Sequence, residues 1–316
     1  MSSKNLVRLK KADHEIQLLK NVIGLLHWDQ ETYMPEAGLE ERSEQLAFLE
    51  GEVHERQTKS EVGELIWECE QQDDLNIVDS AFIRESRRIY DRETKLPKSL
   101  VTAIARQASL NHASWISAKE ASDFSLFRND LCETVRLTRE KAEHLGFRNT
   151  RYDPLLDEFE PWMKTSDLES VLHGLREPLV GLLDKIRGSS VCISDEIIRR
   201  NYDIGSQRAF SKHLLNRLNF SRKFGRLDVS AHPFSITLGA NDGRLTTRFN
   251  PNLISSSIFG TIHECGHGHH GLAVLPEIAT SVLGHGASLG ICESQSRLWE
   301  NIIGRSRVFW EYFYPN

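Results

Sequence analysis

Cysteine is scarce in this chain of 316 residues, and its five cysteines are Cys69, Cys132, Cys192, Cys265 and Cys292. Their odd number, their scatter and the absence of CxxC spacing argue against a disulfide scaffold and against a cysteine-based zinc cluster. No apolar run approaches the roughly 18 residues that a membrane span needs. No apolar segment follows the charged amino terminus, so we expect no secretory leader. We therefore expect a cytoplasmic protein with reduced thiols and no membrane partner.

A basic stripe is also missing, because the net charge is −6 and acidic and basic residues are interleaved. This pattern argues against a nucleic-acid partner. Hydrophobic content of 39% and charged content of 27% are those of an ordinary globular protein. Internal repeats and long linkers are missing as well. The composition therefore leaves the function to be read from local motifs.

Apolar residues recur at helical spacing from Leu6 to about Leu218. They form one amphipathic stripe up to Leu26, and the pattern restarts after Pro35 and Gly38. Further helices are predicted over residues 39–53, 64–70, 78–90, 100–118, 126–145, 167–186 and 195–218. The sequence therefore predicts a mostly α protein.

Strand-like alternation appears once, in residues 234–238 and 245–249, around a turn that contains Gly239 and Gly243. This pattern predicts a β-hairpin. In zinc peptidases an edge strand beside the metal commonly holds an extended substrate by main-chain pairing. Two interpretations stay open, a substrate-binding strand and a hairpin that only covers a helical bundle.

The most informative motif is HExxH, from His263 to His267. On a helix, residues four apart share a face, so both imidazoles can reach one metal ion, and Glu264 is placed to take a proton from metal-bound water. We predict a helix from Ile258 to Ala273, with Ser255–Ser257 supplying its N-cap. Its glycines indicate close backbone packing or an early helix end. The alternative is a buried structural histidine pair.

A catalytic zinc site needs a third protein ligand. His270 can complete a three-histidine site, whereas the metzincin position ten residues after His263 is Ala273. Glu293, thirty residues after His263, is the better candidate, in a helix predicted from Leu289 to Trp310. The alternative for Glu293 is a solvated surface carboxylate.

Four ordered motifs carry a family resemblance. HExxH is followed by ESQSRLWEN from Glu293, and it is preceded by HPF at His232 and by DGRLT at Asp242. The segments WDQETYMP at Trp28 and YDPLLD at Tyr152 extend the match over nearly the whole chain. The sequence resembles the carboxypeptidase Taq family of zinc metallocarboxypeptidases.

This resemblance implies a mostly helical, saddle-like zincin fold with a small β-hairpin or sheet beside a groove, and a homodimer. It implies that His263, His267 and Glu293 bind one divalent metal, zinc by preference, with cobalt able to substitute. Glu264 is then the catalytic general base. The resemblance also implies a substrate-binding role for His232 and a substrate-binding or supporting role for Arg244.

The chain departs from the family pattern in two places. Cys292 stands where the family has histidine, so it is a small core residue, a competing ligand or a weaker support for the metal site. Cys265 is expected to be a packing thiol. The later IRxxAD and GxxQDxHW motifs do not occur, and five aromatic residues gather between Phe309 and Tyr314. We therefore expect a truncated catalytic region.

On this basis residues 1–220 are expected to form a helical lobe along one groove wall. Residues 221–316 are expected to form a partial catalytic region. The leading hypothesis is a metallocarboxypeptidase that removes single amino acids from peptide C-termini by metal-activated water, with Glu264 as base. One alternative is an inactive family member that binds metal or a partner. Another is an endo-acting oligopeptidase with the same chemistry.

Overall fold

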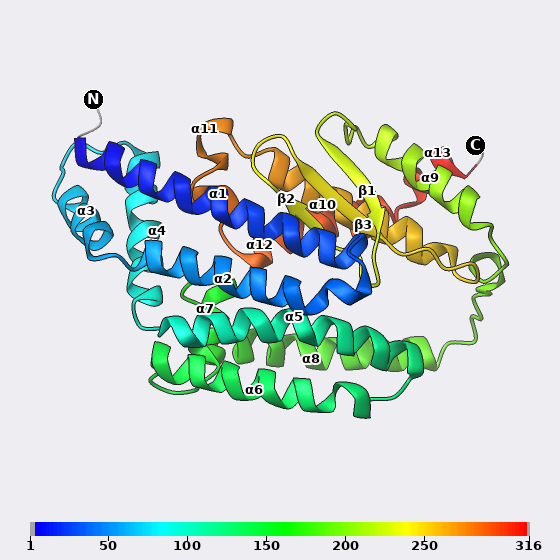
Figure 1. Ribbon diagram of the computed structural model, residues 1–316. Helices are drawn as coiled ribbons and strands as arrows, with labels where there is room; N and C mark the ends of the chain where they lie inside the picture. Colours follow the sequence, from blue (N-terminus) through cyan, green and yellow to red (C-terminus); the bar gives the residue numbers. More distant parts are fainter. Residues whose placement is uncertain (1–3, 315–316) are drawn as a thin grey trace.

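The computed structural model describes residues 4–314, and they are mostly helical (Figure 1). Residues up to 187 contain α1 (Lys4–Thr32), η1 (Glu36–Gly38), α2 (Leu39–Gln57), α3 (Ser60–Glu70), α4 (Ile77–Glu93), α5 (Lys98–Ala121), α6 (Ser125–Leu145), α7 (Asp153–Phe159) and α8 (Thr165–Arg187). The residues that follow contain η2 (Glu196–Ile198), α9 (Ile204–Arg217), β1 (Gly225–Val229), β2 (Ser235–Thr237), β3 (Gly243–Thr247), α10 (Ile254–Leu272), α11 (Pro276–Ala279), η3 (Val282–His285), α12 (Leu289–Arg297), η4 (Leu298–Ile303) and α13 (Arg307–Phe313). The predicted mostly α class is confirmed.

Before residue 220, most predicted helices agree with the observed ones within a few residues, but the stretch predicted from 195 does not. Its helix, α9, begins only at Ile204, because Asp203 caps it by accepting a hydrogen bond from the backbone N–H of Ser206. An N-cap residue has non-helical backbone angles, so a helix starts after it. The residues before Asp203 form only the short 3₁₀ turn η2.

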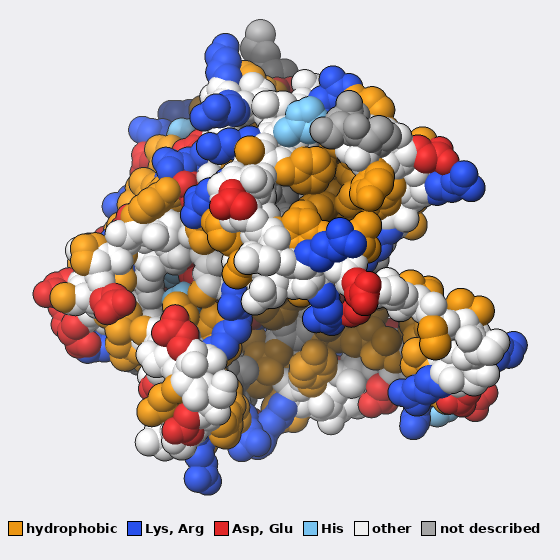
Figure 2. All heavy atoms as spheres, turned by 90° about the vertical axis from the view of Figure 1, so that its right-hand side faces the viewer, with side chains coloured by type: hydrophobic (Ala, Val, Ile, Leu, Met, Phe, Trp, Pro, Cys, Tyr) orange, Lys and Arg blue, Asp and Glu red, His pale blue; other side chains and the backbone are white. Residues whose placement is uncertain are grey.

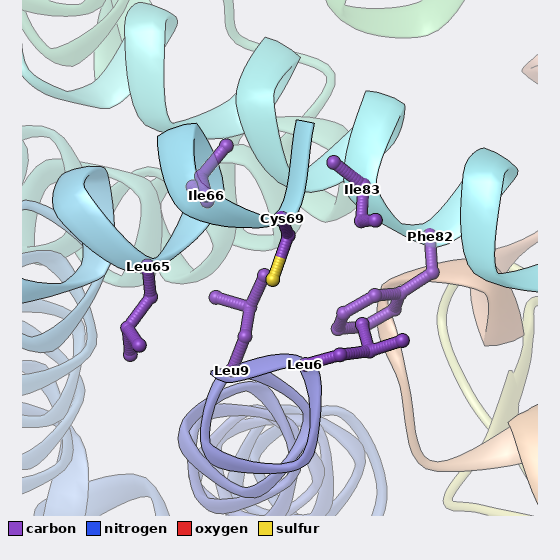
Figure 3. Packing of buried hydrophobic residues seen from close by; sticks show 7 residues of the cluster. All are labelled: Leu6, Leu9, Leu65, Ile66, Cys69, Phe82 and Ile83. Atoms are coloured by element: carbon purple, nitrogen blue, oxygen red, sulfur yellow. The ribbon is translucent and has the colours of Figure 1, made fainter. Parts of the chain in front are cut away.

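Four helices, α1, α2, α5 and α6, are arranged as stacked antiparallel neighbours. Figure 1 shows α1, α2, α5 and α6 lying one below another, and α2 packs along α5 and α5 along α6. At the amino-terminal end, Leu6 and Leu9 of α1 pack against α3 and α4 through Ile66, Cys69 and Phe82 (Figure 3). This cluster of fully buried side chains fixes the direction of α1.

Between α1 and α10 lies a three-stranded sheet in the order β1-β3-β2. The predicted hairpin is confirmed, since β2 pairs antiparallel with β3 and Ser235 lies opposite Leu245. Strand β1, parallel to β3, was not predicted. Its residues Arg226 and Asp228 form an ion pair of 2.6 Å on the strand, and Asp228 is buried whereas Val229 is exposed, so burial does not follow the polar and apolar order of the sequence. Strand β2 is an edge of the sheet.

The two faces of this sheet meet different helices. A Cβ atom placed on Gly24 of α1 would meet Ile236, and one placed on Gly271 of α10 would meet Thr237. Side chains alternate between the faces of a strand, so Ser235 shares the α10 face with Thr237. Arg244 lies opposite Ile236 and therefore faces α1. The sheet thus separates α1 from the HExxH helix.

Helix α10 begins earlier than predicted and without the predicted cap. Its first residue is Ile254, so Ser255–Ser257 lie inside the helix and not at its N-cap. Ser257 instead donates a hydrogen bond of 2.7 Å to the side chain of Gln207. Because that contact is buried between α10 and α9, the serine serves packing and not helix initiation.

The helix predicted from Leu289 to Trp310 is wrong as a single element. Helix α12 passes into the π-helical segment η4, where the N–H of Gly304 bonds to the carbonyl of Trp299 five residues earlier. Ser306 then caps the separate helix α13 by accepting from the N–H of Phe309. Polar capping competes with helix continuation at such a residue.

The aromatic residues near the carboxyl end find partners within the chain. Phe309 and Phe313 are buried against Leu214 of α9 and Ile258 and Ile262 of α10. These two side chains are therefore covered by helices of the same chain. Tyr312 and Tyr314 are exposed.

Apolar side chains also reach the surface elsewhere. On α8 the exposed hydrophobic residues are Val171, Leu172, Leu175, Leu179, Val180, Leu182, Leu183 and Ile186. Figure 2 shows hydrophobic side chains lining a hollow on the face that lies at the right of Figure 1. Among residues 4–314, no helix is long and apolar enough to cross a membrane.

Close packing explains a glycine of the HExxH motif. A Cβ atom on Gly266 would lie 2.8 Å from Cα of Ser296 and 2.9 Å from the carbonyl oxygen of Gln295, both backbone atoms of α12. Backbone cannot move aside as a flexible side chain can. Gly266 therefore sets how closely α12 approaches α10, as one interpretation of the sequence proposed.

We expect Gly266→Ala to lower the free energy of unfolding by about 1–3 kcal/mol, because the new methyl group overpacks the α10–α12 contact. The matched control is Gly174→Ala on α8, where nothing lies within 4 Å of the added Cβ. That change is expected to raise stability by up to about 1 kcal/mol through helix propensity. Urea denaturation measures both, and equal effects of the two substitutions would contradict the close contact.

Candidate metal centre

Three side chains from two helices converge beside the sheet. His263 and His267 lie one turn apart on α10, and Glu293 extends from α12. The Nε2 atom of His263 is 3.6 Å from one carboxylate oxygen of Glu293, and the Nε2 atom of His267 is 3.7 Å from the other. One ligand atom from each residue lies within 4.8 Å of the other two. Two imidazoles and a carboxylate are a donor set that fits zinc.

His270 does not join this group. Among the described residues, the set of His, Cys, Asp and Glu side chains close enough to hold an ion consists of His263, His267 and Glu293. The ring of His270 instead faces Gly286, where an added Cβ would lie 3.1 Å from its Cε1 atom. The structure therefore does not place His263, His267 and His270 around one ion.

The carboxylate of Glu293 is held by its own helix. Ser288 caps the start of α12 by accepting from the N–H of Ile291, and Ser296 donates a hydrogen bond of 2.8 Å to Glu293 Oε2. The buried Ser296 lies at the contact with Gly266. The contact that brings the two helices together thus also orients the carboxylate.

Each histidine has a second partner at its Nδ1 atom. For His263 this partner is Glu300 Oε2 at 2.9 Å, and for His267 it is Cys292 Sγ at 3.2 Å. Glu300 was not predicted from the sequence, although its spacing of seven residues from Glu293 places both on one side of a helix. Both Nε2 atoms are left pointing at Glu293.

The two cysteines near the site differ in their surroundings. Cys265 is fully buried among Leu215, Phe220 and Leu245, and burial raises the pKa of its thiol to about 12. The expectation of a packing thiol at Cys265 is confirmed. Burial, together with the charges of Glu293 and Glu264, also raises the pKa of the Cys292 thiol. Cys292 therefore faces His267 as a neutral thiol.

Glu264 is a buried carboxylic acid between α10 and the sheet, only 5% exposed. Burial raises its pKa to about 8, against a lowering hydrogen bond with Ser235 and with smaller raising contributions from Glu293 and Glu300. Burial lowers the pKa of His267, and the charge of neighbouring His263 lowers it further. His267 is thus a neutral imidazole at neutral pH, the form that binds a metal ion.

The two remaining predicted residues lie apart from this group. His232 is exposed on the connection between β1 and β2, and its Nδ1 atom is 2.7 Å from the carbonyl of Pro233. Arg244 bonds to Asp242 at 2.8 Å and lies over the Trp28 ring, 4.4 Å from its centroid. Because its side chain faces α1, the sheet separates Arg244 from the HExxH helix.

Two hollows meet beside the centre. A pocket of about 230 Å³ is bounded by β2, by His267 and His270, and by the loop around Gly284. A larger groove of about 680 Å³ runs between α1, α2, α4 and α5 on one side and residues 282–289 on the other. His285, Gly286 and Cys292 line both. The groove therefore leads to the converging ligands.

Comparisons with known proteins agree along the whole chain. A family model described as Carboxypeptidase Taq (M32) metallopeptidase matches residues 8–316. Thermostable carboxypeptidase 1 of Thermus thermophilus is 37% identical over 97% of this chain and 62% of its own length. Carboxypeptidase 1 of Bacillus subtilis is 32% identical over 97% of this chain and 60% of its own.

Solved structures give the same result. The crystal structure described as BsuCP superposes with a TM-score of 0.96 and 30% identity, covering 99% of this chain and 63% of that one. A Pyrococcus furiosus carboxypeptidase described as Apo-Mg has a TM-score of 0.89 and 31% identity, over 100% of this chain and 64% of that one. The chain thus spans less than two thirds of the length of these relatives.

The buried acid of Glu264 predicts a pH dependence of stability in chelator-treated protein. Folded Glu264 keeps its proton up to about pH 8, whereas an ordinary glutamate releases it near 4.5. Between these values the folded state binds more protons than the unfolded state, so the free energy of unfolding falls as pH rises. Urea denaturation measures the free energy of unfolding of the unaltered protein and of Glu264→Gln. Between about pH 5 and about pH 8, the value for the unaltered protein should fall relative to that of the variant. A difference independent of pH would refute the raised pKa.

The converging donors predict stabilisation by zinc. A ligand that binds only the folded state adds about 2.7 kcal/mol at a hundredfold excess over its dissociation constant. We expect zinc to raise the melting temperature of the unaltered chain and of His173→Ala, which removes an exposed imidazole of α8. His267→Ala should show no such rise. Equal responses of the two histidine variants in thermal unfolding would contradict the site.

Proposed function

The chain belongs to the carboxypeptidase Taq (M32) family of metallopeptidases, and from this we propose that it removes single amino acids from peptide C-termini. The observation that carries the proposal is the convergence of His263, His267 and Glu293 beside the buried carboxyl of Glu264. Zinc is the proposed metal because the donors are two imidazoles and one carboxylate, and cobalt can substitute.

We assign His263, His267 and Glu293 as the residues that hold the metal. When bound, the metal supplies Lewis-acid polarisation of the substrate carbonyl and acidifies a water molecule. Glu264 accepts the proton of that water and later donates it to the leaving amine. The charge of a bound metal ion would lower the pKa of Glu264 from its metal-free value of about 8, which would leave the carboxylate ionised and able to accept this proton.

Strand β2 is proposed to hold the substrate backbone. It is an edge strand, so one side of its main chain is not engaged by β3. An extended peptide can add to such an edge by main-chain hydrogen bonds. Ser235 on β2 interacts with Glu264, so a peptide paired along this strand would pass the general base. This arrangement favours the substrate-binding interpretation of the hairpin.

His232 and Arg244 lie apart from the metal centre, and the roles proposed for them are less direct. We propose that His232 positions substrate from the exposed connection between β1 and β2. Arg244 is proposed to support the sheet, because it packs on Trp28 and bonds to Asp242 on the α1 side. Arg226 lies over the same ring, 4.8 Å from its centroid. Two guanidinium groups on one indole fix the sheet against α1 by cation–π contacts.

The organisation of the chain fits the same proposal. We propose that residues up to 220 provide one wall of the groove, and that residues from 221 provide the catalytic elements. A homodimer is a further proposal from the family resemblance, and a cytoplasmic location is a further proposal from the scattered cysteines. The relatives are longer than this chain, so metal binding without turnover is the competing outcome.

The test is release of the C-terminal amino acid from an N-blocked dipeptide in the presence of zinc or cobalt. We expect Glu264→Gln to reduce this release by about 10²–10⁴-fold, the usual contribution of a general base, while metal binding is retained. Glu277→Gln on α11 replaces an exposed glutamate and should leave the rate unchanged. Unchanged turnover in Glu264→Gln would refute the general-base assignment. No release by a folded, zinc-binding chain would favour the inactive alternative.

A further inference from the structure

We propose that Glu300 is a positioning residue that fixes His263 in the tautomer whose Nε2 atom is free to bind the metal. The proposal rests on the metal-binding role assigned to His263 above. Glu300 does not touch the centre itself, since it contacts the opposite nitrogen of the ring. Its action would therefore pass through the imidazole.

The contact leaves one arrangement of protons. His263 Nδ1 and Glu300 Oε2 are 2.9 Å apart, and an ionised carboxylate can only accept a hydrogen bond. The Nδ1 atom must then carry the proton, and a neutral ring keeps its lone pair on Nε2. That nitrogen is the one that lies 3.6 Å from Glu293. A carboxylate behind a ligating histidine also raises the basicity of the ligand.

Two arginines bind the carboxylate of Glu300 and hold it in place. Arg305 donates to Oε1 at 2.7 Å, and Arg297 donates to Oε2 at 3.1 Å. Arg305 is itself fixed over the ring of Phe259, 3.9 Å from the centroid. The carboxylate therefore has a set position relative to α10.

The backbone brings Glu300 close to the HExxH helix. Glu300 lies in the π-helical segment η4, a type of helix that is frequent at functional sites. At Gly304, which ends this segment, an added Cβ would lie 3.1 Å from Ile262, the residue before His263. The segment from α12 to Gly304 thus approaches α10 closely at two points, once at Gly266 of α10 and once at Gly304.

The partner of the other histidine is weaker. His267 Nδ1 faces the Cys292 thiol at 3.2 Å, and a neutral thiol forms weaker hydrogen bonds than a carboxylate. The two ligands are therefore held unequally. If Glu300 positions His263, replacing Glu300 should cost more metal affinity than replacing Cys292.

A purely structural role is the competing explanation, because Glu300 also joins η4 to Arg305 by an ion pair. That role would affect the stability of the fold. It would not set the tautomer of His263 or the zinc affinity of protein that remains folded. These two quantities therefore separate positioning from structure.

The first measurement is the tautomer of His263 in the full, metal-free chain, from ¹⁵N–¹H correlation spectra of ¹⁵N-histidine-labelled protein. The signal is assigned by its loss in His263→Ala. We expect Nδ1 to be protonated and Nε2 not. In Glu300→Gln the amide can turn either its oxygen or its NH₂ group toward the ring, so a mixture of tautomers is expected.

The second measurement is zinc affinity by competition with a chelator, on variants shown to be folded by circular dichroism. We expect Glu300→Gln to bind zinc about 10–100-fold more weakly than the unaltered chain, and Cys292→Ala to lose less. Glu311→Gln, which replaces an exposed partner of Arg307 on α13, should bind as the unaltered chain does.

Protonation of Nε2 in the unaltered chain would overturn the proposal, and so would undiminished zinc affinity in Glu300→Gln. If Glu300→Gln does not fold, the tautomer in the unaltered chain still decides. Absence of zinc binding in the unaltered chain would instead refute the metal-binding function. The tautomer measurement would then still test whether Glu300 sets the ring.

Discussion

The site depends on the close contact between α10 and α12. Gly266 permits it, because no side chain stands between the HExxH helix and the backbone around Ser296. At this separation the carboxylate of Glu293 reaches both Nε2 atoms at 3.6 and 3.7 Å. Three donors form an ion site only when their separation is fixed to fractions of an ångström. The glycine therefore matters to the chemistry as much as the ligands do.

The sheet supplies the second constraint. Its α10 face carries Ser235 toward Glu264, and its α1 face carries Arg226 and Arg244 toward Trp28. Burial between helix and sheet is the main reason that the pKa of Glu264 rises to about 8. The packing of α10 against the sheet thus creates the desolvated environment of the proposed base. Function and stability share these contacts.

Around the centre, charge is arranged in layers. The proposed ligands face inward, the carboxylate of Glu300 lies behind His263, and Arg297 and Arg305 lie behind that carboxylate. A buried carboxylate is costly unless opposite charges or hydrogen bonds compensate it. Here the charge of Glu300 is compensated by Arg297 and Arg305, which lie nearer the solvent. His267 lacks such a chain, because its outer neighbour is the thiol of Cys292.

The sequence by itself determined the helical class, the hairpin and the spacing of His263 and His267, because helical and strand periods are local properties of the chain. The choice of Glu293 came from the resemblance of its segment to a family motif. Only the tertiary structure decided what lies behind each histidine, which face of the sheet Arg244 occupies, and where the helix predicted from Leu289 breaks into η4 and α13. It also decided the parallel strand β1, whose charges at Arg226 and Asp228 satisfy each other. These features depend on contacts between residues distant in sequence, and local patterns of hydrophobicity carry no record of such contacts.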